Sequence, residues 1–242
     1  MKICVAQTRP IKGNIQRNIE NHKRIIGLAL AKGADTIIFP ELSVTGYEPE
    51  LANELATSPE DDRFDEFQKI SDISQVTIGV GVPIKNNMGI SITMVLFRPH
   101  QPRQTYAKKY LHADEEPYFA SGEGSVGFIG EKKNVALAIC YEIFIPEHAE
   151  TAFKNGAEMY IASVAKSVKG MDKAIERLAQ IAEEYTITVF MANCVGYCDN
   201  FECGGKTSVW NKKGLLQGQL NDTSEGILIL DTDTQELIQK TL

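Results

Sequence analysis

The chain has 242 residues, of which 43% are hydrophobic and 24% charged, and its formal net charge at pH 7 is −7. Such a length and balance are typical of a soluble globular protein with one large core. Because the sequence has no linker, repeat or low-complexity tract, we expect a single domain over residues 1–242. The negative charge argues against nucleic acid or an anionic membrane surface as the main partner, and no apolar run has the length of a membrane span.

The amino terminus and the cysteines bear on the cellular compartment. Residues 1–10, MKICVAQTRP, lack the long apolar segment of a signal peptide. Five cysteines are an odd number, and their spacing is not that of a small disulfide-bonded scaffold. We therefore expect a cytoplasmic protein whose thiols are reduced.

Short apolar runs bounded by Gly, Pro or Asn predict β-strands along the whole chain. They lie at residues 2–6, 36–39, 76–82, 90–97, 135–140, 159–164, 187–192, 207–210 and 227–230. A further strand is expected to begin at Arg103. The residues Asn86-Asn87-Met88-Gly89 predict a hairpin turn between two of the strands.

Helical periodicity predicts three longer helices, at residues 14–32, 147–155 and 172–184, and a weaker pattern covers residues 61–71. Gly33 follows the first helix as a suitable C-terminal stop. The order is strand, helix, strand, then a β-rich middle, then strand, helix, strand. Two sheets with helices on their outer faces satisfy this α/β pattern, and periodicity alone also allows a doubly wound sheet.

Two reactive side chains stand at the ends of predicted strands. Cys140 ends the strand 135–140 and precedes a polar turn and a helix, a position that would help to hold its thiol as thiolate. Glu41 follows the buried strand 36–39 and Pro40, where partial burial would raise its pKa toward that of a general base. Each alone has an ordinary alternative: a buried inert thiol and a solvated loop carboxylate.

Lys108 and Lys109 follow the strand that begins at Arg103. An ammonium group fixed there would stabilise an oxyanion and lower the pKa of a neighbouring thiol. Because neighbours on a strand point to opposite faces, only one of the two lysines can face a site, and a surface lysine is the ordinary alternative.

Taken in order, these residues resemble the Glu–Lys–Cys triad of the nitrilase superfamily. The central motifs are Phe39-Pro40-Glu41-Leu42, Tyr106-x-Lys108-x-x-Leu111 and Ala138-Ile139-Cys140-Tyr141-Glu142. Around them stand residues 1–7, residues 14–21, Glu115-x-x-Tyr118-Phe119-x-x-Gly122, Phe190-Met191-Ala192-Asn193-x-x-Gly196 and Gly205-x-x-Ser208. The resemblance covers nearly the whole chain. It implies an αββα sandwich, in which two mixed sheets are covered by helices in four layers.

The resemblance also assigns roles to individual residues. It selects Lys108 over Lys109, and it places a further carboxylate, which orients the lysine and the substrate, at Glu115, with Glu116 as the alternative. It implies Tyr47, Glu142, Lys166 and Asn193 as substrate-binding residues. Glu142 departs from the family pattern, which commonly has Asp at that position.

The implied activity is hydrolysis of a non-peptide carbon–nitrogen bond of a small molecule through a thioester on Cys140. Glu41 would accept the thiol proton, while Lys108 and the backbone N–H of Tyr141 stabilise the tetrahedral oxyanion. No metal or organic cofactor is required. The expected partners are a small-molecule amide and a second copy of the chain, as a homodimer or higher homo-oligomer.

Two alternatives to an amidase or N-carbamoyl amide hydrolase remain open. A catalytically silent ligand-binding or scaffold protein would have the same fold, although the complete triad argues against it. A true nitrilase would act on nitriles, but the nitrile-cleaving members usually have Trp after the cysteine, where this chain has Tyr141.

Three further motifs are weaker. Residues 122–127 match G-x-G-x-x-G but lack the preceding strand and following helix that dinucleotide binding requires. Ser163 and Lys166 match S-x-x-K of serine acyl-transfer sites, but Ser163 ends a predicted strand. Cys194, Cys198 and Cys203 form C-x3-C-x4-C, which differs from the usual spacing of zinc ligands, so we expect ordinary thiols near the rim of a pocket.

Overall fold

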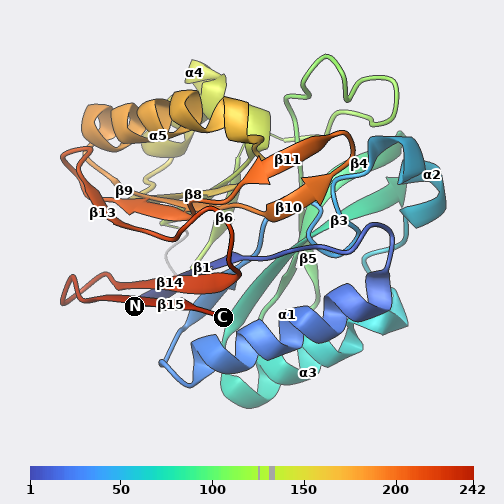
Figure 1. The fold of residues 1–242 in the computed structure, drawn as a ribbon, viewed down its shortest axis with the longest axis horizontal. Coiled ribbons are helices and arrows are strands. Elements are labelled where there is room, and N and C mark those ends of the chain that lie inside the picture. The colour runs from blue at the N-terminus through green and yellow to red at the C-terminus, as the bar shows by residue number, and fades with distance from the viewer. Residues whose placement is uncertain (125, 131–133) are drawn as a thin grey trace.

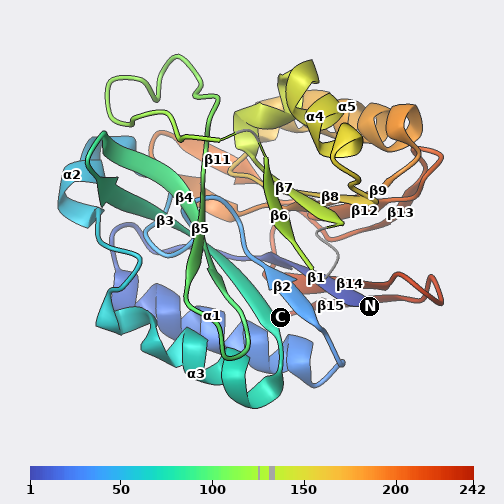
Figure 2. The same cartoon turned by 180° about the vertical axis from the view of Figure 1, so that it is seen from behind.

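Two mixed β-sheets pack face to face, and helices cover the outer face of each, so that the molecule has four layers (Figures 1 and 2). The computed structural model describes residues 1–124, 126–130 and 134–242. Contacts of β1 (Lys2–Gln7) with β9 (Thr188–Ala192) join the two sheets. The predicted αββα sandwich is confirmed, and the doubly wound alternative is excluded.

The first sheet has seven strands in the order β15-β14-β1-β2-β3-β4-β5. Its other members are β2 (Thr36–Ile38), β3 (Thr77–Asn86), β4 (Gly89–Phe97), β5 (Gln104–Ala107), β14 (Gly226–Asp231) and β15 (Leu237–Thr241). The helices α1 (Ile15–Leu30) and α3 (Asp65–Ser74) cover its outer face (Figure 1). Side chains of β1 alternate between the layers, because Ile3 packs between the sheets and Cys4 packs under the helices.

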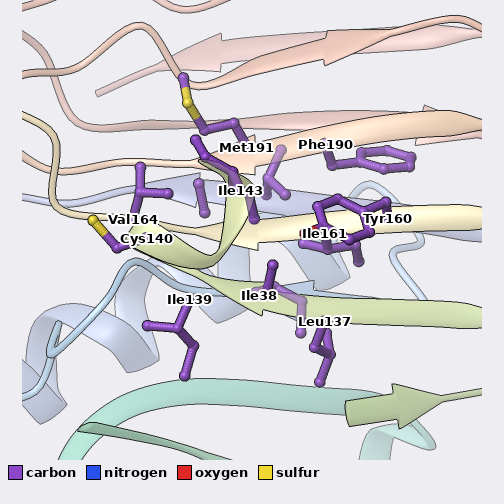
Figure 3. Packing of buried hydrophobic residues seen from close by; sticks show 14 of the residues in the cluster. Ile38, Leu137, Ile139, Cys140, Ile143, Tyr160, Ile161, Val164, Phe190 and Met191 are labelled. Atoms are coloured by element: carbon purple, nitrogen blue, oxygen red, sulfur yellow. The ribbon is translucent and has the colours of Figure 1, made fainter. Parts of the chain in front are cut away.

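The second sheet has six strands in the order β13-β12-β9-β8-β7-β6. Its other members are β6 (Gly127–Ile129), β7 (Val135–Ile139), β8 (Met159–Ser163), β12 (Ser208–Trp210) and β13 (Leu216–Gln219). The helices α4 (Pro146–Lys154) and α5 (Met171–Tyr185) cover it (Figure 2). Leu137 and Ile139 of β7 belong to the same buried cluster as Ile38 of the first sheet (Figure 3).

The predicted strands and helices are found with ends shifted by a few residues. Asn86 pairs with Gly89, which confirms the predicted hairpin turn. Cys140 is not the last strand residue, since β7 ends at Ile139 and a 3₁₀ turn, Cys140–Phe144, follows. Two segments without predicted elements contain α2 (Ala52–Leu55) and the hairpin of β10 (Val195–Cys198) and β11 (Phe201–Gly204).

None of the helices in the described part of the chain combines the length and the apolar character needed to cross a bilayer.

Candidate active site

The Cys140 backbone bends sharply where β7 meets the 3₁₀ turn. Its φ of +46° lies in the left-handed region, which costs a residue other than glycine on the order of 1–3 kcal/mol and is frequent at active sites. The side chain is 8% exposed and lines a cavity of about 480 Å³. Figure 3 shows Cys140 at the end of the buried cluster, just beyond the strand. The bend therefore presents the thiol to the cavity.

Glu41 is held at the end of β2 by a close approach of β3. A Cβ atom on Gly81 would lie 2.6 Å from the carbonyl oxygen of Pro40 and 2.3 Å from the backbone nitrogen of Leu42, so only glycine allows β3 to pass this segment. From the other sheet, the Ser163 hydroxyl donates a hydrogen bond of 2.8 Å to the carbonyl of Phe39. Both sheets thus fix the backbone that carries Glu41.

Lys108 lies between two carboxylates and is completely buried. Its Nζ donates to Glu41 Oε1 at 2.8 Å and to Glu115 Oε1 at 2.6 Å. Glu115 is itself oriented by the Tyr47 hydroxyl at 2.9 Å and by the backbone N–H of His112 at 2.8 Å. The structure therefore brings Glu41, Lys108, Glu115 and Tyr47 together in one hydrogen-bonded group.

The neighbours of these residues face elsewhere. Lys109 is half-buried, with its Nζ 5.3 Å from the centre of the Tyr110 ring, and Glu116 is exposed. Lys108 and Glu115 therefore belong to the buried hydrogen-bonded group, and Lys109 and Glu116 do not.

Burial and charge together determine the protonation of the triad. Burial alone lowers the pKa of Lys108, but the carboxylates of Glu41 and Glu115 outweigh it, so the pKa is raised and the group stays a cation. Burial raises the pKa of Glu41 above its ordinary value, against the opposing effect of Lys108. Glu41 Oε2 is buried and has no hydrogen-bond partner among the described residues, so it is free to take a proton.

The Cys140 thiol is protonated at pH 7, which differs from the expected thiolate. Burial and the charge of Glu41 raise its pKa to about 11, although Lys166 and Lys108 lower it. The positions of Lys108 and of the turn after the strand are therefore insufficient to ionise the thiol. Nucleophilic attack by this thiol would therefore require a base to remove its proton, and the buried Glu41 Oε2 is a candidate for that role.

Several of the predicted site residues line the cavity. Its wall contains Tyr47, Glu115, Cys140, Tyr141 and Lys166. Further lining residues include His112, Asp114 and the hairpin tip Asp199, Asn200 and Phe201. The sequence indicates this hairpin, because Asp199-Asn200 separates two short segments in a pattern typical of a hairpin turn.

Two of the predicted substrate-binding residues lie behind the cavity wall. Asn193 is buried, accepts a hydrogen bond of 2.9 Å from the Lys166 backbone N–H and donates one of 2.8 Å to the Gly205 carbonyl. It thus shapes the segment that carries Lys166. Glu142 is fully buried and is not among the residues that line the cavity.

The weaker motifs are placed as follows. The Ser163 hydroxyl donates its hydrogen bond to the Phe39 carbonyl. In the G-x-G-x-x-G segment, Gly127 is the first residue of β6, and residue 125 lies outside the described residues. Cys194, Cys198 and Cys203 are buried on one face of the β10–β11 hairpin. In the described part of the chain, no group of three or more His, Cys, Asp or Glu residues could hold a metal ion.

This geometry agrees with a family match over almost the entire sequence. The sequence model of the carbon–nitrogen hydrolase family matches residues 2–240. The chain belongs to this family. It is accordingly a hydrolase that acts on carbon–nitrogen bonds.

Solved and curated members of the family resemble the chain at low identity. The amidase from Nesterenkonia sp. AN1 has a TM-score of 0.85 at 23% identity, over 96% of this chain and 89% of that one. The 2-oxoglutaramate amidase of Bacillus subtilis is 27% identical, over 85% of this chain and 81% of its own. The glutamine-dependent NAD(+) synthetase of Thermotoga maritima is 26% identical over the whole chain, which spans 44% of that protein's length.

Proposed function

We propose that this carbon–nitrogen hydrolase cleaves the amide bond of a small molecule, as an amidase or N-carbamoyl amide hydrolase. The observation that carries the proposal is the buried group of Glu41 and Lys108 beside a thiol that opens on a cavity of about 480 Å³. Similarity to proteins named as amidases supports the amide over the nitrile as substrate.

Each of these residues has a distinct role in the proposed reaction. As Cys140 Sγ attacks the carbonyl carbon, Glu41 takes the thiol proton, and Lys108 with the Tyr141 backbone N–H stabilises the oxyanion. Glu41 then protonates the leaving nitrogen, which departs as ammonia or an amine and leaves a thioester. Water, deprotonated by Glu41, attacks the thioester, the carboxylic acid leaves, and the sulfur regains its proton.

Lys166 favours a substrate that carries a negative group. It is the one lysine or arginine among the described residues of the cavity wall, and no described carboxylate forms a salt bridge with it. Its Nζ lies 4.8 Å from the centre of the Phe144 ring. Of the acidic residues in the wall, Glu115 is paired with Lys108 and Asp199 is half-buried, while Glu50 and Asp114 are exposed, so that water screens their charges. We propose that Lys166 binds a carboxylate of the substrate.

Release of ammonia from a pair of matched amides tests this function. Succinamate and butyramide have similar size, and only the first carries a carboxylate. We expect both to be hydrolysed, with the higher kcat/KM for succinamate, and Lys166→Met to reduce that preference about tenfold, as for loss of a charged hydrogen bond. Hydrolysis of a matched nitrile but of neither amide would contradict the proposal, and an unchanged preference in Lys166→Met would remove Lys166 from substrate binding.

Lys108→Ala is expected to lower kcat at least about a hundredfold, the scale for loss of an oxyanion donor. Lys109→Ala is the matched control and should cost little, because its side chain faces away from the triad. Lys108→Ala also leaves two buried carboxylates without their cation, which lowers stability. Rates are therefore compared per folded molecule, with the folded fraction of each variant taken from its circular dichroism spectrum. The reverse ranking of the two variants would contradict the assignment.

A further inference from the structure

Glu142 joins the two segments that carry the nucleophile and the catalytic lysine. Its Oε2 accepts a hydrogen bond of 2.7 Å from the backbone N–H of Ile139, and its Oε1 accepts one of 2.7 Å from that of Lys109. Ile139 immediately precedes Cys140, and Lys109 immediately follows Lys108. One buried carboxylate thus holds a peptide group next to each of the two catalytic residues.

The local sequence explains the first of these bonds. Glu142 is the third residue of the 3₁₀ turn Cys140–Phe144, and its side chain reaches back to the N–H of the residue before the turn. This is the glutamate half of a capping box, which satisfies a backbone donor that the turn leaves open. The second bond is not local, because β5 and the segment after it come from the edge of the other sheet.

A chain of buried side chains supports Glu142 from behind. The Tyr106 hydroxyl donates to Glu142 Oε2 at 2.6 Å, and its oxygen lies 2.9 Å from His148 Nε2. His148 Nδ1 lies 2.8 Å from the Tyr160 hydroxyl. Tyr106 comes from β5, His148 from α4 and Tyr160 from β8, so the chain links the first sheet, the second sheet and its helix layer.

The hydrogen bonds in this chain can all point the same way. Burial lowers the pKa of His148 to about 4, so the ring is neutral at pH 7 and carries one N–H. Tyr106 uses its proton on Glu142, so its oxygen accepts from His148 Nε2–H. His148 Nδ1 then accepts from Tyr160. With two backbone N–H groups added, three donors converge on the Glu142 carboxylate. Burial raises the pKa of this carboxyl above its ordinary value, and the three hydrogen bonds oppose that rise.

We propose that Glu142 is a positioning residue that fixes Cys140 relative to Lys108, rather than a group that touches the substrate. It does so by binding the peptide groups beside both residues, and the Tyr106–His148–Tyr160 chain holds its carboxylate in place. The inference rests on the proposed amide hydrolysis for its kinetic readout only.

Glu142→Gln tests the role with almost no change of volume. The amide has one oxygen, and its NH₂ group would face a backbone donor, so at least one of the two segments loses its bond. Because a displacement of about 1 Å can cost a hundredfold in rate, we expect kcat to fall about ten- to a hundredfold with little change in KM. Glu147→Gln, an exposed position on α4, is the matched control and should retain both constants.

Two readouts separate positioning from general loss of structure. The rate is expressed per folded molecule, and the folded fraction of each variant is taken from its circular dichroism spectrum. Hydrogen exchange at the amides of Ile139 and Lys109 needs no substrate, and we expect it to be faster in Glu142→Gln. If the wild-type protein hydrolysed no amide, the proposed function would fail, and the exchange data would still decide whether Glu142 holds the two segments.

Tyr106→Phe provides a second variant if Glu142→Gln does not fold. It removes one donor to the carboxylate but leaves both backbone bonds, so we expect a smaller fall in kcat and faster exchange at Ile139. The inference is overturned if kcat per folded molecule matches the wild type in the variants that fold. Unchanged exchange at both amides would overturn it equally.

Discussion

Cys140→Ala should abolish amide hydrolysis and leave the fold intact. The thiolate forms the covalent bond to the acyl group, so no other step can proceed without it. Alanine has a Cβ atom, as cysteine does, so the substitution leaves the backbone strain at φ +46° unchanged. We expect ammonia release at the level of the blank, and a circular dichroism spectrum like that of the wild type.

Cys4→Ala is the matched control for this variant. Cys4 is completely buried under the helix layer and does not line the cavity, so its loss should lower stability slightly and leave turnover in place. Comparable turnover in Cys140→Ala, or loss of turnover only in Cys4→Ala, would mean that the nucleophile has been misassigned.

Glu41→Gln should lower kcat by roughly a hundredfold or more, the usual contribution of general acid–base catalysis. Glutamine keeps the shape of the side chain and can still accept the hydrogen bond from Lys108, but it cannot carry a proton. Because the pocket is preserved, we expect little change in KM. Retained turnover would make Glu41 structural, and Glu115→Gln would then be the next variant to measure, since Glu115 also contacts Lys108.

The same variant should change the pH dependence in a defined direction. Glu41 acts as base when ionised, and its pKa is raised above 4.5, so the wild-type kcat/KM should fall as the pH drops through a value above 4.5. That acid limb should disappear in Glu41→Gln. Meanwhile the charge of Glu41 raises the pKa of Cys140, so its removal should increase the thiolate absorbance at alkaline pH while turnover falls.

The central strands could be predicted from the sequence because both of their faces are buried. Strands such as β7 and β8 are continuous apolar runs with every residue buried, and such runs are easily recognised. The strands that were missed in the two large sheets, β6, β13 and β15, all lie at sheet edges. Edge strands have half-exposed, polar sequences such as LQGQ in β13, so apolar periodicity does not reveal them.

The candidate site was predictable where a residue follows a recognisable strand. Glu41 and Cys140 come directly after buried strands, and the order of the motifs selected Lys108. The roles of Glu142 and Asn193 were not predictable, because they depend on contacts between distant segments. Nothing in the local sequence shows that the Glu142 carboxylate meets the backbone N–H of Lys109 from another sheet.

The protonation state of Cys140 was also beyond sequence reasoning. It depends on the balance between full burial and the charges of Glu41, Lys166 and Lys108, and this balance raises the pKa. A position at the end of a strand indicates access to a ligand, but it does not give the net electrostatic potential at the sulfur.

Trapping the acyl-enzyme tests the central claim most directly. A reaction with succinamate is quenched in acid at short times, and the intact mass and the peptide containing Cys140 are measured. Glu41→Gln is included because slower deacylation should let the thioester accumulate. We expect a mass gain equal to the substrate minus ammonia, on Cys140, and no gain in Cys140→Ala. Product formation with Cys140 unmodified in both proteins, or an acyl group on another residue, would contradict the mechanism.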